Sequence, residues 1–152
     1  MDCFRPLQIR PPCKVLILVG LLFCLGCGDD PNNPRSLVPV GGKVTLDGKP
    51  LTKAVVTFVP QAGNPIKVNP TGALDETGSY QLVTSGIAGA PRGAFKACVA
   101  LSPADEDNIR KKGLKLGFTI DPKYRSPDTT PFSIQVENGA QPGAYDLNLT
   151  SK

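Results

Sequence analysis

GKVTLDGKPL (residues 42–51) and AVVTFVP (residues 54–60) carry the alternation and the turn of a β-hairpin. Val44 and Leu46 alternate with polar residues, so both apolar side chains fall on one face of an extended strand. Asp47-Gly48 follows directly and supplies two residues that tolerate positive φ, as a tight hairpin turn requires. The stretch therefore predicts two short strands joined by a turn.

The same pattern recurs along the rest of the chain. Further strands are predicted over residues 51–59, 80–83, 94–101, 132–136 and 145–149, with a loop over residues 60–70. In the third of these, Phe95 and Val99 share one face and Cys98 lies on the other. Sixteen glycines and sixteen prolines suit many short strands better than long helices. These features predict an all-β sandwich of about seven strands.

One segment has the pattern of a helix instead. Ser102 provides a capping hydroxyl, Pro103 suits the first helical position, and acidic residues follow at once. Basic residues over 110–112 complement the helix dipole before Gly113 ends the pattern. We expect one short helix inserted between strands, and because so short a helix is marginal alone, we expect it to dock.

The N-terminal segment has the pattern of a secretory signal. Arg5 and Arg10 precede KVLILVGLLFCLGC (residues 14–27), which itself begins with Lys14 and whose apolar run is too short for an ordinary membrane span. The polar segment that follows cannot bury enough surface to order itself. We therefore predict a signal peptide over residues 1–26, a flexible tether over residues 27–37 and a β-sandwich domain over residues 38–152. An uncleaved signal anchor is the alternative.

Gly26-Cys27 resembles the lipobox of bacterial lipoproteins, although Cys24 stands where that motif usually has Leu. The resemblance implies that Cys27 is acylated on sulfur and becomes the mature N-terminus. It also implies a protein held by lipid on the extracytoplasmic side of a membrane in the cell envelope. Cys98 is then a lone, partly buried residue on a strand. If Cys27 is not acylated, a Cys27–Cys98 disulfide becomes an alternative.

The domain itself resembles carboxypeptidase-regulatory-like domains. The similarity rests on the two opening strands with their Gly48-Lys49-Pro50-Leu51 turn, on LDETGSY (residues 74–80) and on PRGAFKA (residues 91–97). It implies a Greek-key sandwich related in shape to transthyretin. Such domains serve as connectors, stalks or binding modules.

The sequence lacks the motifs of several kinds of catalytic and metal-binding site. The chain has no His, which removes His-based triads and most transition-metal sites, and it has no S-x-x-K motif. Most of its acids fall at turns or at the helix start, where they favour local hydrogen bonds; they are Asp75, Glu76, Asp105, Glu106, Asp107, Asp121 and Asp128. The acids at 105–107 lack the glycine and glutamate of an EF-hand loop. We therefore predict no catalytic residues, no metal site and no cofactor.

The net charge and the composition of one loop indicate which kinds of partner the domain binds. The net charge is +4, and loss of residues 1–26 removes three bases and one acid to leave +2, which argues against nucleic-acid binding. Tyr124, flanked by Lys123 and Arg125 in a long loop, is the candidate contact with a partner. We expect a non-catalytic interaction or structural module whose partner is an envelope protein or polysaccharide. A small envelope enzyme or solute-handling accessory with an unlocated carboxylate site is the alternative.

Overall fold

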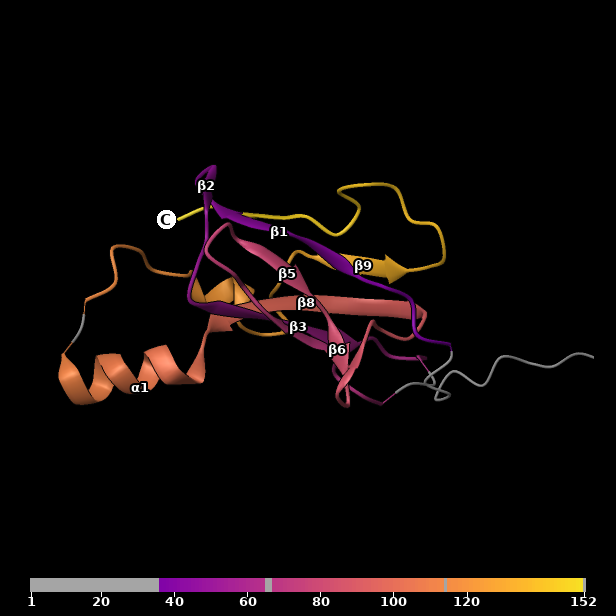
Figure 1. Ribbon diagram of the computed structural model, residues 1–152, viewed down its shortest axis with the longest axis horizontal. Helices are drawn as coiled ribbons and strands as arrows, with labels where there is room; N and C mark the ends of the chain where they lie inside the picture. The colour runs from indigo at the N-terminus through magenta and orange to yellow at the C-terminus, as the bar shows by residue number, and fades with distance from the viewer. Residues whose placement is uncertain (1–35, 65–66, 114, 152) are drawn as a thin grey trace, which may run out of the picture.

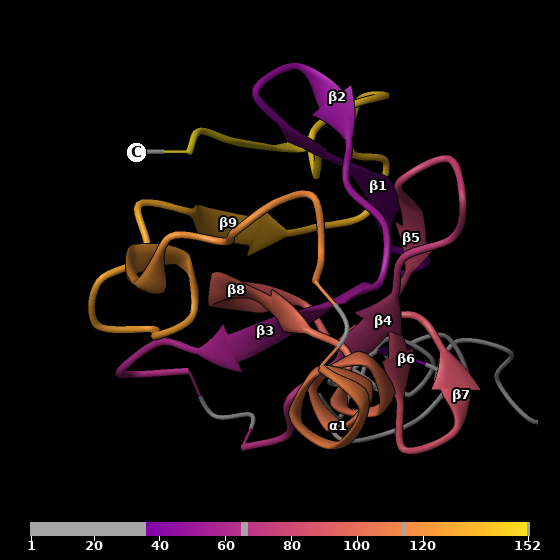
Figure 2. The same ribbon diagram turned by 90° about the vertical axis from the view of Figure 1, so that its left-hand side faces the viewer.

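Two β-sheets and one α-helix make up the computed structural model, which describes residues 36–64, 67–113 and 115–151 (Figures 1 and 2). This agrees with the expected all-β sandwich, although the described residues form ten short strands rather than about seven. The strands are β1 (Gly41–Leu46), β2 (Lys49–Pro50), β3 (Ala54–Pro60), β4 (Thr71–Ala73), β5 (Ser79–Gln81), β6 (Val83–Thr84), β7 (Ile87–Ala88), β8 (Gly93–Leu101), β9 (Ser133–Val136) and β10 (Leu147–Leu149).

The first sheet is built on β1. Its order is β10-β1-β2, and β5 also pairs with the start of β1. The predicted hairpin turn is confirmed, because Asp47 and Gly48 both have positive φ (51° and 78°) between β1 and β2. β10 runs parallel to β1 with Val44 opposite Leu147 and Leu46 opposite Leu149. The C-terminal strand therefore ends beside the Asp47 turn.

The second sheet has the order β7-β6-β4-β3-β8-β9. Its centre is the antiparallel pair β3 and β8, in which every residue of β3 has a partner. Phe95 and Val99 face the core as predicted, and Cys98 on the opposite face is also buried. β8 is thus covered on both sides.

Among the described strands the chain crosses between the sheets four times, and two of these crossings lie at Lys53 and at Leu82. The strand predicted over residues 51–59 is confirmed only from Ala54, because Lys53 has a φ of 59° and interrupts the extended structure before β3. At the other of these two crossings, Leu82 is fully buried between β5 on the first sheet and β6 on the second. These crossings bring the two sheets together around one core.

The core lies between the inward faces of the two sheets. Its largest fully buried side chains are Phe58, Phe95, Leu51, Leu82, Leu147 and Leu149. Phe58 and Phe95 come from neighbouring strands, with ring centroids 6.0 Å apart. The alternation read from the sequence therefore identified the core face of each strand.

The helix α1 (Pro103–Lys112) has the predicted ends. Ser102 caps it by accepting a hydrogen bond from the Asp105 amide, and Gly113 ends it with a φ of 63°. We expected this helix to dock against the sandwich. It does so less than expected, because none of its residues is buried. Figure 1 shows α1 projecting from the end of the sandwich where the C-terminus also lies.

The predicted signal peptide, Cys27 and most of the tether lie outside the described residues. No helix in the part of the chain that the structure describes is long and apolar enough to cross a membrane. The described chain begins beside β7, where Val38 pairs with Ala90. β1 then runs from that end of the sandwich toward the end that carries α1 (Figure 1).

Candidate functional site

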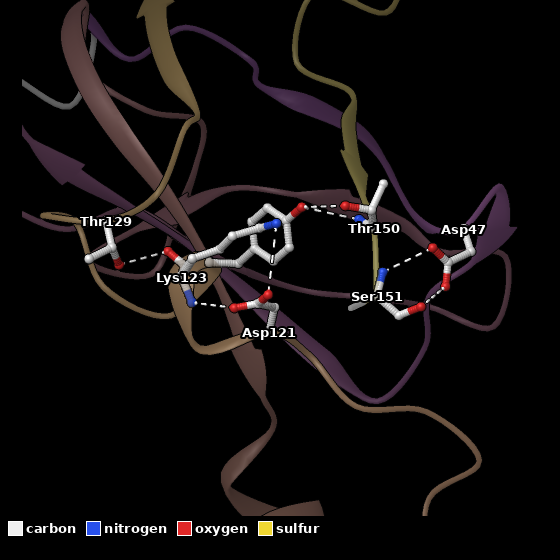
Figure 3. Close-up of polar contacts among 7 residues, drawn as sticks. Asp47, Asp121, Lys123, Thr129, Thr150 and Ser151 are labelled. Carbon is white, nitrogen blue, oxygen red and sulfur yellow. Dashed lines mark hydrogen bonds and ion pairs between the residues drawn. The ribbon is translucent and has the colours of Figure 1, made fainter.

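The predicted contact residues lie where the Asp47 turn, the end of β10 and the 3-10 helix η2 (Pro122–Tyr124) meet (Figure 3). Asp121 caps η2, and its Oδ1 accepts a 3.0 Å hydrogen bond from the Lys123 amide. An Asp followed by Pro at the first helical position favours such a turn. Local sequence therefore places Asp121, Lys123 and Tyr124 together.

Tyr124 does not have the exposed ring that a partner contact needs. It is 3 % exposed and stacks on Phe132, with centroids 5.5 Å apart and ring planes 19° apart. Its hydroxyl accepts a 3.1 Å hydrogen bond from the Thr150 amide. Tyr124 thus joins η2 to the end of β10, and the contact prediction is left to Lys123 and Arg125.

Lys123 lies over the ring that it was expected to flank. Its Nζ is 4.7 Å from the centroid of Tyr124 and 3.8 Å from Asp121 Oδ2. Burial opposes ionisation of Tyr124, but hydrogen bonds from Thr150 and the Lys123 ammonium outweigh it and lower the pKa of this phenol. The Lys123 side chain stays 39 % exposed.

Arg125 is exposed and links the loop to the helix. Its guanidinium donates a 3.3 Å hydrogen bond to Glu106 on α1. Both side chains are about half exposed, so the pair contributes less than about 1 kcal/mol. Arg125 is therefore available to a partner and also restrains α1.

Asp47 and Ser151 close the far side of the site (Figure 3). Asp47 accepts hydrogen bonds from both the Ser151 hydroxyl and the Ser151 amide, the latter at 2.9 Å. These bonds lower the pKa of the Asp47 carboxyl. The sequence identified Asp47 only as a turn residue, since nothing local signals a partner 104 residues away.

Two hollows flank the loop over residues 115–120. We call the first, of about 560 Å³, the acidic groove; it is lined by Leu46, Asp47, Leu116, Gly117, Phe118, Thr119, Asp121, Pro122 and Ser151. We call the second, of about 380 Å³, the basic groove; it is lined by Leu101, Ile109, Lys115, Leu116, Phe118, Thr119, Ile120 and Arg125. The grooves share Leu116, Phe118 and Thr119 and carry opposite charge.

A third hollow, of about 640 Å³, lies on the first sheet away from this site. Lys43, Asp75 and Asp146 line it. The Asp75 carboxylate accepts hydrogen bonds from the Thr77 hydroxyl and from the Ser79 and Thr77 amides, which lower its pKa. Asp75 is thus committed to the turn, as the sequence predicted.

The remaining predicted positions are less informative. Cys27 lies outside the described residues, and Cys98 is a free, buried thiol. Among the described residues, no group of three or more acidic or cysteine side chains is arranged to hold a metal ion. No family model, curated protein or solved structure matches this chain. The site therefore has to be interpreted from its own geometry.

Proposed function

We propose that the protein is a lipid-anchored, extracytoplasmic lipoprotein whose β-sandwich is a non-catalytic interaction module at the cell envelope. Cys27 is the anchor in this proposal. Support for the anchor comes from the basic leader, the short apolar run and the Gly26-Cys27 pair. A cysteine with two or more acyl chains holds a protein stably on a membrane.

One structural observation supports the module best. The first described residues pair at one end of the sandwich, through Val38 and Ala90, while the grooves lie near α1 and the end of β10. Figure 1 shows these ends on opposite sides of the domain. A tether over residues 27–37 spans at most about 40 Å when extended. A lipid at Cys27 would attach the domain through the first end and leave the grooves at the end away from the attachment point.

Neither of the two described carboxyls with a resolved pKa shift has the raised pKa of a general acid. A general acid in a hollow needs a carboxyl with a raised pKa. Among the described carboxyls with a resolved shift, Asp47 and Asp75, the pKa is lowered mainly by hydrogen bonds, from Ser151 to Asp47 and from Thr77 and Ser79 to Asp75. The alternative of a small envelope enzyme has no comparable support.

A Greek-key, carboxypeptidase-regulatory-like sandwich is part of the same proposal. Its support is the sequence motif, together with the fact that the motif residues occupy turns and strands. Asp47-Gly48 forms the first turn, and the hairpin of residues 74–80 closes through a 2.9 Å bond from the Asp75 amide to the Ser79 carbonyl. Domains of this kind act as connectors or binding modules, which agrees with an interaction role.

The test is the intact mass and the N-terminal peptide of the protein from bacterial membranes. We expect a chain that starts at Cys27 and carries a diacylglyceryl adduct. Cys27→Ser should abolish the adduct, whereas Cys24→Ser should leave it in place. An unmodified soluble chain with another N-terminus would overturn the anchor.

A further inference from the structure

We propose that the acidic groove receives the basic side chain of a partner protein, a lysine or an arginine. The inference deepens the proposed interaction role and rests on it. Among the described residues that line this groove, Asp47 and Asp121 are the charged ones. A cation is therefore the complementary ligand.

Asp121 is the residue that points to a ligand. It is 7 % exposed, and its Oδ2 has no hydrogen-bond partner. Nζ of Lys123 is 3.8 Å from that oxygen, beyond hydrogen-bond reach. A buried carboxylate oxygen without a donor is destabilising, and an incoming ammonium or guanidinium supplies donors.

The walls of the groove suit the stem of a basic side chain. Leu46, Leu116, Phe118 and Pro122 provide apolar surface beside the two acids. Lysine and arginine bury their methylene stems against such surface while the charged head seeks a polar partner. Asp47, the second acid that lines the groove, is exposed. Its carboxylate can pair with the charged group of the same basic side chain or with that of a second one.

Lys123 acts as an internal competitor in this arrangement. Its ammonium lies 3.8 Å from Asp121 Oδ2, within ion-pair distance, and 4.7 Å from the centroid of the Tyr124 ring. An incoming cation that bonds Oδ2 meets repulsion from this ammonium. Removing the charge of Lys123 should therefore strengthen binding, which a purely structural role of Asp121 does not predict.

The experiment is an amide-shift titration of the full chain in nonionic detergent. The probes are Nα-acetyl-lysine methylamide, its norleucine counterpart, which has a similar stem without the ammonium, and calcium chloride. We expect the lysine compound to give saturable shifts over residues 116–121 and Ser151. The norleucine compound should bind about tenfold more weakly or not at all.

Two variants and a control separate recognition from folding. Asp121→Asn keeps the acceptor for the Lys123 amide and should weaken lysine binding about tenfold, whereas Lys123→Met should strengthen it. Asp75→Asn, in the third hollow, should leave it unchanged. Equal binding of both compounds, or unchanged binding in Asp121→Asn, overturns the proposal.

The titration with calcium chloride tests whether the groove binds a metal ion instead. Saturable shifts with calcium alone, and none with the lysine compound, would assign the groove to a metal ion and also overturn the proposal. Lipidation is read by mass and groove binding by amide shifts. Failure of the anchor is therefore distinguishable from failure of the groove.

Discussion

The hydroxyl of Tyr80 donates a 2.7 Å hydrogen bond to the carbonyl oxygen of Tyr145, 65 residues further along the chain. Tyr80 lies on β5, and Tyr145 lies two residues before the strand β10; both strands pair with β1. The ring of Tyr80 is buried, so this bond lies inside the core. It holds the segment that leads into β10 against the first sheet.

Tyr80→Phe should lower the free energy of unfolding by about 1–3 kcal/mol, because it leaves the buried carbonyl of Tyr145 without its donor. Chemical denaturation of the full chain measures the change. Tyr124→Phe is a useful comparison, since its hydroxyl is only part-buried. A cost of Tyr80→Phe below that of Tyr124→Phe would contradict the central role of this bond.

Alkaline pH provides a separate test of Tyr80. Burial is the main cause that raises its pKa above the usual 10.0 in the folded protein. The unfolded chain then loses the phenolic proton first, so stability falls as pH rises above about 10. The fall should be smaller in Tyr80→Phe than in the parent, measured by denaturant unfolding between pH 9 and about 11. Equal slopes would show that Tyr80 is not the group responsible.

The backbone at Tyr145 passes so close to Gly42 that residue 42 has no room for a side chain. A Cβ at Gly42 would lie 2.5 Å from the Tyr145 carbonyl oxygen, and the atom it meets is backbone. Gly42→Ala should therefore destabilise the domain by about 1–3 kcal/mol. Gly117→Ala is the matched control, because no atom lies within 4 Å of its added Cβ. Thermal unfolding of the two variants should separate them clearly, and equal melting temperatures would contradict the close approach.

Local signals explain what the sequence predicted correctly. Asp47-Gly48 forms its turn and Ser102 caps its helix because each depends on residues a few positions away. Alternation predicted the buried faces of β8 and β10 for the same reason.

Long-range pairing explains what the sequence did not predict. Tyr124 was expected to contact a partner because it lies between Lys123 and Arg125 in a long loop, but Thr150, which bonds its hydroxyl, is 26 residues away. The break at Lys53 was missed because lysine carries no signal for its positive φ. The acidic groove likewise combines residues from the Asp47 turn, the loop over 115–122 and the chain end.

Cys98 should be almost unreactive in the folded protein. The thiol is buried on β8, and burial followed by the charge of Asp128 raises its pKa. Both effects slow attack on a disulfide reagent, because the thiolate is the nucleophile. We expect modification more than about a hundredfold slower than in denaturant, where the site opens. Lys112→Cys at the exposed end of α1 is the reactive control, and rapid native modification of Cys98 would contradict its burial.

Asp47 should control the end of β10 in a pH-dependent way. The hydrogen bonds from Ser151 hold the pKa of Asp47 below 3.8, so the ionised form is favoured in the folded state. The resulting stabilisation is complete above that value and is lost as pH falls through the lower, folded pKa. The Ser151 amide should therefore lose protection from hydrogen exchange at acid pH before the core amides do.

Asp47→Asn should remove this pH dependence at Ser151, while Asp75→Asn should leave it intact, because Asp75 bonds a different turn. Asp47 and Ser151 also line the acidic groove, so acid should disturb one wall of that groove without unfolding the domain. Binding of a basic side chain would then weaken at low pH for two reasons, loss of negative charge and loss of the wall. If the Ser151 amide instead exchanges together with the core amides at every pH, the Asp47 bond has no local role and the groove is rigid down to global unfolding.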